Sequence, residues 1–511
     1  MTTRTPAMVA LVLLGTSCSP HHTVERPAAP VDLPDGYAQT AGDETETVRP
    51  GDAIPAEWWV AFGDPELNHL VDEALARNFQ LGAAWARLEQ AESGVQAQAS
   101  GFWPQISAQL DVARRRQVIV FGSLGVQEFE NNSLGISLPV SYEIDLWNRV
   151  GHSVTAAGLD ALASRDDVEA LAMTVVANVV ETWLNVVQQR ASRRLLEDQL
   201  ETNRILLELV TLRFAHGLGT ALDIYQQRQQ VEATEAQLAQ IDGGETVARH
   251  NLAVLVGRPP SAFVGEIGAL PEPTALPPLP PMPEAGVPGD LLLRRPDVRA
   301  AQRRVAAQDH RVGAAIADQY PSFRISASIG VSSPNIEALL SSFVWSLAGS
   351  LLAPVLDGGR RAAEVRRNQA ALRERLQTFA QTLLTAMLEV ENALALERQL
   401  VVQIENLEEQ LIAARATLDE SRNRYGQGLS DYLPVLTALG TSQRAEQSIL
   451  AAHRSLLSQR VQLARALGGS WTTELEAPRL PNPREAEIAD EDEADEEDED
   501  VDDEAAQESQ R

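Results

Sequence analysis

The sequence lacks lysine entirely and has a single cysteine, Cys18. All 42 basic residues among the 511 are arginine. Without lysine the chain has no P-loop lysine for a nucleotide phosphate, no Schiff-base lysine for pyridoxal phosphate and no lysine nucleophile. One cysteine cannot form an internal disulfide, a CxxC redox pair or a cysteine-based zinc cage. These absences exclude several classes of enzyme and of cofactor site.

An excess of positive charge and long apolar runs are also missing. The 42 basic residues face 72 acidic ones, so the formal net charge is −30. Such a chain lacks the basic face that supplies most of the affinity for nucleic acid, and we expect no nucleic-acid partner. Beyond the N-terminus no eighteen apolar residues run together, which predicts no transmembrane helix. Any membrane span must then be made of strands.

The N-terminus has the composition of an export signal. Residues 1–17 carry one cation, Arg4, and an apolar stretch from Ala7 to Leu14, which is too short to span a bilayer. Cys18 follows small residues and is a candidate acceptor for covalent lipid such as palmitate, with outer-membrane sorting favoured by Ser19. The lipoprotein pattern usually has leucine where Gly15 stands. A plain signal peptide with an incidental cysteine is therefore the alternative.

The C-terminus is strongly acidic. Between Arg484 and Arg511 there are sixteen acidic residues and two arginines, with almost nothing apolar to bury. We predict a disordered, solvated tail over residues 476–511. The alternative is weak binding of divalent cations by this tail.

Proline divides the rest of the chain. Residues 140–258 and 355–433 contain no proline and are rich in Ala, Leu, Gln, Glu and Arg, which favours long helices. Ten of the 28 prolines lie between Pro259 and Pro288, a composition that excludes helix. We predict an N-terminal linker at 18–55, a first repeat at 56–260, a Pro-rich linker at 261–290 and a second repeat at 291–475.

The two halves resemble each other at a constant offset of 211 residues. The segment from Arg213 to Leu218, RFAHGL, aligns with the segment from Arg424 to Leu429, RYGQGL. Without a gap the same offset pairs Leu222 with Leu433 and Gly257 with Gly468. This agreement predicts two copies of one structural unit.

Within each half the apolar period indicates a long helical hairpin. A helix from Gly151 to His216 would reach about 100 Å at about 1.5 Å per residue. Between Leu383 and Leu418 apolar residues follow heptad spacing with some polar positions, as in a coiled coil. Helices of this length must pack along neighbours to bury their apolar stripes.

Before each long helix the period changes to two. We predict two strands per half, at 105–117 and 128–145 and at 322–332 and 341–354, in which apolar side chains alternate with serine and glycine. One face in lipid and one in water explains this pattern, and a soluble sheet with one buried face is the alternative. Four strands cannot close a barrel, and open edges are not viable in hydrocarbon. A membrane barrel would therefore need strands from several chains.

Three motifs carry a resemblance to a known family. They are WW at Trp58-Trp59 followed by FGDP at Phe62–Pro65, RRPDVR at Arg294–Arg299, and YPS at Tyr320–Ser322. The chain resembles the TolC-like outer membrane factor family, specifically the lipoprotein (NodT) branch that works with resistance-nodulation-division pumps. This resemblance implies an α+β homotrimer, mostly helical, in which four strands per protomer form a shared 12-stranded outer-membrane β-barrel above a long periplasmic α-barrel.

The resemblance also implies the function. Members are outer-membrane exit ducts of tripartite efflux systems, and conduct small molecules from an inner-membrane pump and a periplasmic adaptor to the outside without catalysis. No catalytic, cofactor or metal residues are expected. Contacts are expected with outer-membrane lipid, with the adaptor and with a pump of the resistance-nodulation-division type.

The same resemblance places the functional residues at the helical turns. The residues expected at the periplasmic gate are Asp223, Tyr425, Arg424 and Asp431. The residues expected in the adaptor-docking turns are Gly217, Leu218, Gly428 and Leu429. A hydrogen bond between Asp223 and Tyr425 is predicted to hold the gate closed, and the alternative is that both residues cap the turns. Relatives often carry an aspartate at the position of Ser430, where it forms an acidic ring in the trimer. The sequence therefore neither predicts nor excludes such a ring here.

Two other functions agree less well with the sequence. A periplasmic adaptor also has coiled-coil hairpins, but it would have one hairpin inserted in a small β domain, whereas this sequence predicts two hairpins and two strand pairs. A secreted hydrolase has little support, because the sequence contains no GxSxG or HExxH motif.

Overall fold

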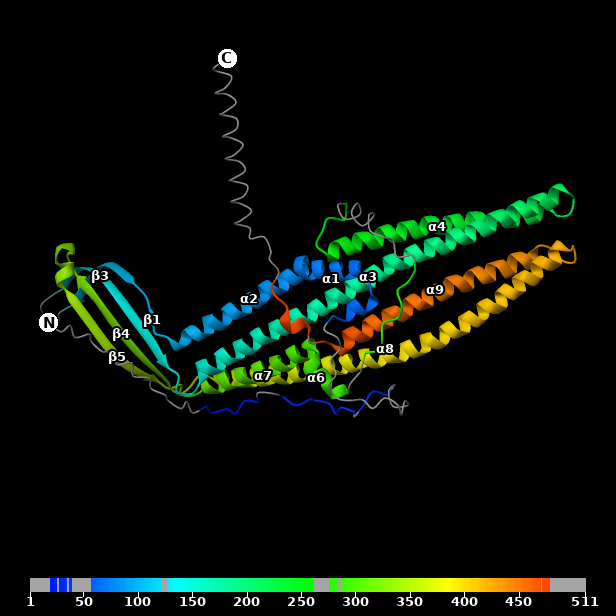
Figure 1. The fold of residues 1–511 in the computed structure, drawn as a ribbon. Coiled ribbons are helices and arrows are strands. Elements are labelled where there is room, and N and C mark those ends of the chain that lie inside the picture. Colours follow the sequence, from blue (N-terminus) through cyan, green and yellow to red (C-terminus); the bar gives the residue numbers. More distant parts are fainter. Residues whose placement is uncertain are drawn as a thin grey trace, which may run out of the picture. The chain divides into compact units, whose positions relative to one another are not determined.

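The computed structural model describes residues 19–24, 27–34, 36–38, 57–120, 126–261, 275–283, 287–469 and 471–477 (Figure 1). The predicted signal peptide, Cys18 and nearly all of the acidic tail lie outside these residues. Within them the chain forms long helices and one sheet.

The helices come in two matching sets. They are α1 (Pro65–Arg77), α2 (Phe79–Ala99), α3 (Arg149–Ala215), α4 (Ala221–Leu255), α6 (Leu291–Arg294), α7 (Pro296–Ala317), α8 (Arg360–Gly426) and α9 (Leu433–Leu467). The helices α3 and α8 each have 67 residues, and α4 and α9 each have 35. The predicted helix from Gly151 to His216 is thus confirmed to within two residues. Equal lengths in both sets support the internal repeat.

The sheet is antiparallel and contains strands from both halves. Its strands are β1 (Gln105–Ile106), β2 (Gln109–Val120), β3 (Val126–Ile144), β4 (Ser322–Ser333) and β5 (Phe343–Leu352). Their order is β1-β3-β4-β5, and β2 also pairs with β3, so β1 and β2 are two pieces of one strand. The four predicted strands are therefore confirmed. Among the described residues, the outer edge of β2 and that of β5 have no strand partner.

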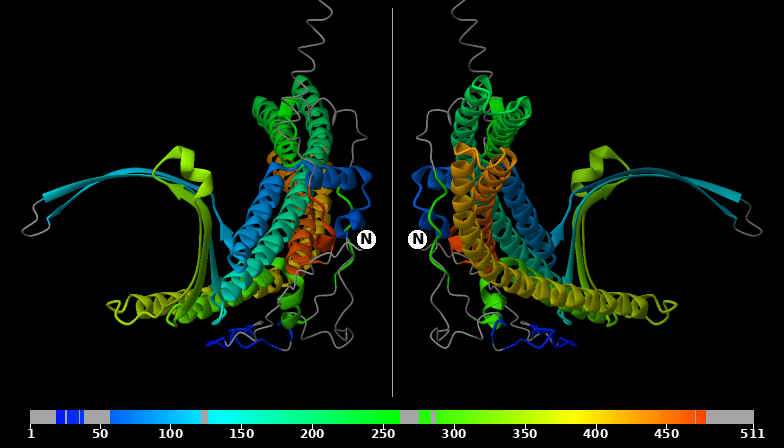
Figure 2. Two further views of the ribbon diagram at one scale, coloured as in Figure 1. Left: turned by 90° about the vertical axis from the view of Figure 1, so that its left-hand side faces the viewer. Right: turned by 90° about the vertical axis from the view of Figure 1, so that its right-hand side faces the viewer.

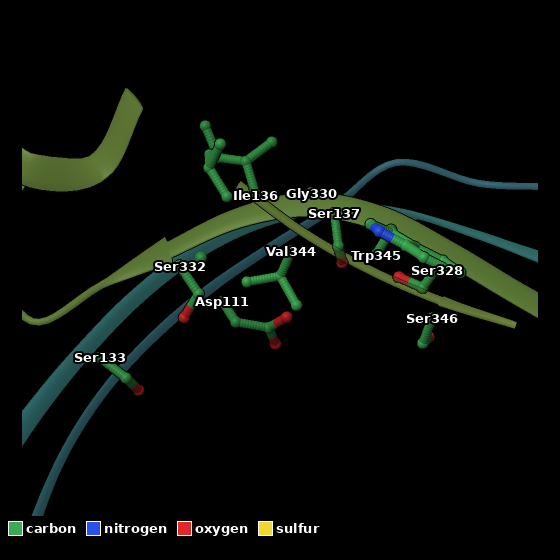
Figure 3. Close-up of a pocket in the computed structure, with 12 residues that line it drawn as sticks. Asp111, Ser133, Ile136, Ser137, Ser328, Gly330, Ser332, Val344, Trp345 and Ser346 are labelled. Atoms are coloured by element: carbon green, nitrogen blue, oxygen red, sulfur yellow. The ribbon is translucent and has the colours of Figure 1, made fainter. Parts of the chain in front are cut away.

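The two faces of the sheet differ in polarity. The register pairs Leu138 with Ile329 on one face, and the next row pairs Ser328 with Ser346 on the other. The sheet is strongly curved (Figure 2). Ser133, Ser332 and Asp111 point to its concave side and Ile136 to the convex side (Figure 3). A curved sheet with a polar concave face and an apolar convex face suits a pore wall with water inside and lipid outside.

A glycine joint is repeated in both halves. Gly257, after α4, has a φ of 76°, and Gly468, after α9, has a φ of 77°. An added Cβ would lie 2.5 Å from the carbonyl oxygen of Arg77 at the first glycine, and 2.8 Å from that of Arg294 at the second. Positive φ and close backbone contact together require glycine. The same structural requirement therefore explains why glycine occurs at both of these positions, which are 211 residues apart.

Replacing this glycine should destabilise the protein. Gly257→Ala adds a methyl group against the Arg77 carbonyl and forces alanine into the left-handed region, which we expect to cost about 1–3 kcal/mol. The measurement is the thermal midpoint of the purified protein by circular dichroism. Gly243→Ala is the control, because this helical glycine has nothing within 4 Å of the added methyl group, and it should not lower the midpoint. Equal midpoints in the two variants would contradict the argument.

The chain divides into two compact units, each with segments from both repeats. The first comprises residues 1–32, 87–166 and 297–383, and the second 33–86, 167–296 and 384–511. The first unit contains the sheet with the adjoining parts of α3, α7 and α8. The second contains the hairpin ends and an aromatic cluster in which the ring centroids of Trp59 and Trp471 are 5.1 Å apart. The predicted boundaries of the repeats stay predictions.

One helix meets the length and composition expected of a membrane span. An 18-residue window within α3 has a mean hydropathy of 1.5, but 61% of that window is buried. Its apolar residues include Val176, Val180 and Leu184, which are fully buried. The hydropathy of this window is therefore explained by packing against neighbouring parts of the chain, as in any buried core helix.

Candidate functional site at the hairpin turns

The turn between α3 and α4 is closed by backbone hydrogen bonds. The Leu218 N–H donates to the Arg213 carbonyl over 2.8 Å, and the Gly217 N–H donates to the Phe214 carbonyl over 2.9 Å. Gly217 has a φ of 72°. These two bonds and the left-handed glycine define a Schellman motif, which ends a helix sharply.

The turn between α8 and α9 repeats this geometry. The Leu429 N–H donates to the Arg424 carbonyl over 2.9 Å, and the Gly428 N–H to the Tyr425 carbonyl over 3.0 Å. Gly428 has a φ of 75°. The structure therefore places both glycines in the turns, as predicted. The leucine after each glycine is largely exposed, by 64% at Leu218 and 67% at Leu429.

Asp223 caps the start of α4. The Thr220 N–H donates to one carboxylate oxygen over 3.1 Å, and the Thr220 hydroxyl donates to the other over 2.9 Å. In return the Asp223 N–H donates to the Thr220 hydroxyl oxygen over 3.3 Å. This capping box satisfies N–H groups that an α-helix leaves without partners.

The predicted hydrogen bond between Asp223 and Tyr425 is wrong for this chain. The Tyr425 hydroxyl is buried and has no hydrogen-bond partner among the described residues. The Arg213 guanidinium lies 4.5 Å from the centroid of the Tyr425 ring, a cation–π contact. Burial and the negative charge of Asp223 raise the pKa of Tyr425, so the hydroxyl stays protonated. The Asp223 carboxylate is instead hydrogen-bonded to the backbone N–H and the hydroxyl of Thr220.

The two other predicted gate residues are exposed. Arg424 is on the last turn of α8, and Asp431 lies just before α9. Within the described part of the chain, neither side chain makes an ion pair or a side-chain hydrogen bond. Their charges therefore face outward from this chain. Their part in a gate stays a prediction.

A buried chain of hydrogen bonds joins the two hairpins, and the sequence did not reveal it. The Tyr432 hydroxyl donates to Gln227 Oε1 over 2.6 Å, and Gln227 Nε2 donates to the Asn203 carbonyl over 2.7 Å. Gln443 Nε2 donates to Asn203 Oδ1 over 3.0 Å. The Asn203 amide nitrogen donates in turn to the Thr234 hydroxyl over 2.9 Å. We call this set the amide chain.

The amide chain connects different hairpins through buried groups. Asn203 and Gln227 belong to the α3–α4 hairpin, whereas Tyr432 and Gln443 belong to the α8–α9 hairpin. All four side chains are buried. Tyr432 also belongs to an apolar cluster that includes Val210, Tyr425 and Leu439. The chain and the cluster hold the hairpins together near their turns.

Known proteins with similar sequences are outer membrane proteins of efflux and export systems. The family model for outer membrane efflux proteins matches residues 70–258 and 287–469. OpmQ of Pseudomonas aeruginosa, a pyoverdine export outer membrane protein, is 31% identical over 428 residues, which cover 82% of this chain and 88% of OpmQ. The outer membrane protein OprJ of Pseudomonas aeruginosa is 30% identical over 469 residues, covering 91% of this chain and 95% of OprJ.

Solved structures agree with the sequence relatives. The outer-membrane channel OprN superimposes with a TM-score of 0.78 at 26% identity, covering 89% of this chain and all of OprN. The CmeC outer membrane channel of Campylobacter jejuni has the same fold, with a TM-score of 0.79. The helical hairpins and the curved sheet described above are the parts of such a channel. The chain therefore belongs to the outer membrane efflux protein family.

Proposed function

We propose that this outer-membrane efflux channel is a passive exit duct that is closed at its hairpin turns and opens when its two hairpins separate there. The observation that carries the proposal is the amide chain, which joins buried side chains of the two hairpins near the turns. A conduit of this kind needs no catalytic group or cofactor. It needs a pore wall and a reversible closure.

Three copies of the chain would complete the pore. Among the described residues, two sheet edges of each protomer have no strand partner, and β5 has an exposed apolar row that includes Phe343, Trp345 and Leu347. Strand edges are stable in a membrane only when another strand pairs with them. In a homotrimer the edges of neighbouring protomers pair into a closed barrel, in contact with outer-membrane lipid.

We expect the exposed charges at the turns to contribute to this closure. Arg424 and Asp431 have no partner within the described chain, and each is repeated three times around the axis of a trimer. Opposite charges from neighbouring protomers would then attract across the narrow end of the duct. Asp223 contributes by fixing the start of α4, and its charge stands near Tyr425.

The two turns form the docking surface for the other parts of the machine. Leu218 and Leu429 are exposed on ordered Schellman turns, where they are available for apolar contact with a partner. The partners that fit are a periplasmic adaptor and, beyond it, an inner-membrane pump of the resistance-nodulation-division type. The transported cargo is then chosen by the pump. The relatives carry names as different as pyoverdine export and cation efflux.

Planar lipid bilayers test the proposed function. The purified protein should insert as discrete conducting units and migrate as a heat-sensitive trimer in detergent gels. In a strain that lacks its own exit duct, the protein together with its cognate adaptor and pump should restore drug resistance. Leu218→Asp combined with Leu429→Asp should abolish resistance and leave conductance unchanged. A purified monomer that is soluble without detergent and does not conduct would overturn the proposal.

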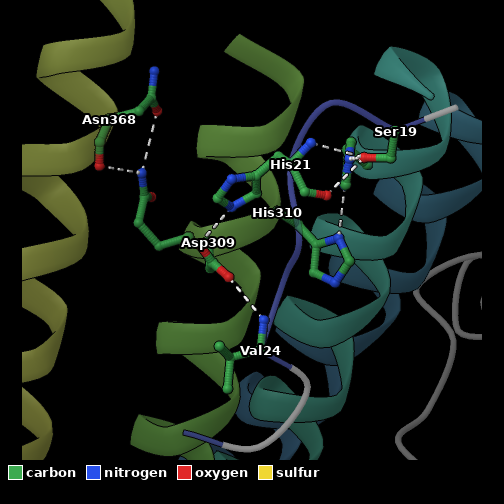
Figure 4. A network of polar contacts seen from close by, with 8 residues as sticks. Ser19, His21, Val24, Asp309, His310 and Asn368 are labelled. Carbon is green, nitrogen blue, oxygen red and sulfur yellow. Dashed lines mark hydrogen bonds and ion pairs between the residues drawn. The ribbon is translucent and has the colours of Figure 1, made fainter. Parts of the chain in front are cut away.

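We also propose that Cys18 carries covalent lipid. The described residues begin at Ser19, which lies against the first turn of α3, directly after the sheet (Figure 4). The first described residue is therefore close to the strands that we propose to span the membrane.

Replacing this cysteine should release the anchor. In cells fed labelled palmitate, the wild-type protein should incorporate label and Cys18→Ser should incorporate none, because serine lacks the thiol through which the lipid would be attached. Mass spectrometry of the N-terminal peptide gives the mass of the acyl groups. A Cys18→Ser protein with unchanged labelling would contradict the assignment, and an unlabelled wild type would favour a plain signal peptide.

A further inference from the structure

Three consecutive arginines on β2 are divided between the two faces of the sheet. Successive residues of a strand point to opposite faces, so Arg114 and Arg116 share one face and Arg115 lies on the other. The register pairs Ala113 with Ser133, and Ser133 points to the concave side (Figure 3). Arg115, two residues after Ala113, is therefore on the concave face.

The two faces differ in how their arginines are compensated. On the convex face each arginine has an acidic partner on β3: Arg114 Nη2 lies 2.6 Å from Glu130 Oε2, and Arg116 pairs with Glu128. The exposed side chain of Arg115 makes no ion pair and no side-chain hydrogen bond within the part of the chain that the structure describes. The concave face therefore carries an uncompensated positive charge at this position.

The concave face has few other charges. The concave positions of β4 are serine or glycine except for Arg324, which forms an ion pair of 3.3 Å with Glu143 at the helical end of the sheet. Asp111 precedes Arg115 by four residues on β2, and Gln109 Nε2 donates to its Oδ1 over 3.0 Å. Four residues of strand span about 13 Å, which exceeds the screening length of about 8 Å at physiological salt. The two charges therefore act separately.

We propose that Arg115 forms a ring of three positive charges in the lumen of the duct, which attracts anions into its outer part, and that Asp111 forms a ring of opposite sign between this ring and the helices. The inference rests on the proposed function, in which three protomers close one barrel around water. The free edges match in length, since β2 has 12 residues and β5 has 10. A neighbouring β5 can therefore cover the middle of β2, where Arg115 lies, and complete the wall there.

A ring of like charges selects among small ions by electrostatics. It raises the local concentration of ions of opposite sign in a water-filled passage, and substitutions in the lumen of a barrel change its selectivity. The field extends about 30 Å at 0.01 M salt and about 10 Å at 0.1 M, so the effect is largest in dilute solution. A guanidinium is not deprotonated in proteins, so the ring keeps its charge at every periplasmic pH. The pump still chooses the cargo.

Reversal potentials in planar bilayers test the two rings. With KCl at about 0.01 M on one side and about 0.1 M on the other, the reversal potential gives the ratio of chloride to potassium permeability. Arg115→Gln should lower this ratio by about twofold, and Arg115→Glu should lower it further, because the ring loses and then reverses its charge. Asp111→Asn should raise the ratio, since it removes the ring of negative charge.

Arg114→Gln is the matched control, because it removes the same charge from the adjacent residue on the convex side of the wall. This variant should keep the ratio of the wild type. An unchanged ratio in Arg115→Gln, or an equal change in Arg114→Gln, would overturn the ring while the duct itself stands, because each variant is measured on discrete conducting units. A wild-type protein that forms no conducting units would overturn the duct, and the ring with it.

Discussion

Gln227→Leu should open the channel. The substitution removes both hydrogen bonds that Gln227 makes and leaves the buried Tyr432 hydroxyl without an acceptor. An unsatisfied buried polar group costs about 1–3 kcal/mol. This free-energy cost destabilises the state in which the two hairpins are joined, and it disappears when they separate. The substitution therefore favours the open state of the channel. Since about 1.4 kcal/mol changes an equilibrium constant tenfold, we expect the open probability to rise by about an order of magnitude per protomer.

Single-channel recording in planar bilayers measures this effect. Gln229→Leu is the control, because Gln229 is an exposed glutamine on the same helix and its loss should leave the recordings unchanged. Tyr432→Phe removes the same hydrogen bond from the other hairpin and should open the channel by a similar factor. Unchanged recordings in Gln227→Leu and in Tyr432→Phe would show that the amide chain does not hold the duct closed.

The amide chain should act independently of pH over the physiological range. Burial raises the pKa of Tyr432 from its ordinary value near 10, and nearby Tyr425 and Asp223 add to this effect. The phenol therefore stays protonated and keeps donating to Gln227 at every pH that the periplasm reaches.

The sequence predicted those features that depend on local physics. The family resemblance placed Gly217 and Gly428 in the turns, and both have the positive φ that glycine adopts without steric cost. Alternation of apolar and small polar residues predicts strands with two different faces, and β3 and β4 have them. In both cases the conformation is decided by a few neighbouring residues.

The prediction for Asp223 failed although a local signal was present. Threonine followed three residues later by an acidic residue is typical of a capping box, and Thr220 and Asp223 have this spacing. The resemblance to a family assigned the aspartate to a gate bond, while the helix start uses both of its oxygens. In the described chain the aspartate satisfies a backbone N–H at the start of α4, and the hydroxyl of Tyr425 on the other hairpin has no hydrogen-bond partner.

The amide chain and the contact between His21 and Asp309 could not be predicted from the sequence. Asn203 and Gln443 are 240 residues apart, and amides on long helices are usually exposed. Their burial depends on which helices pack together and at what register. His21 and Asp309 are separated by 288 residues and meet for the same reason.

Gly330→Ala should prevent assembly of the barrel. Gly330 is on β4, in the middle of the sheet, and pairs with Ser137 on β3. An added Cβ would overlap the carbonyl oxygen of Ile136 and lie 2.9 Å from Ser137 Cα. Backbone atoms of a central strand cannot move away without breaking the ladder, so we expect a cost of about 1–3 kcal/mol per protomer. β3 and β4 come from different repeats, so their pairing is what joins the two halves of the sheet.

The measurement is the amount of assembled trimer in the outer-membrane fraction, detected by its heat-sensitive mobility. Because the cost is repeated in each protomer, we expect at least a tenfold loss of trimer in Gly330→Ala. Gly349→Ala is the matched control on the neighbouring strand β5, where the nearest atom to an added Cβ is Phe323 Cζ at 3.7 Å, an ordinary contact. Similar amounts of trimer in both variants would mean that the β3–β4 pairing tolerates the methyl group. A loss confined to Gly330→Ala would identify this pairing as the step on which barrel closure depends, since every other strand contact is the same in the two variants.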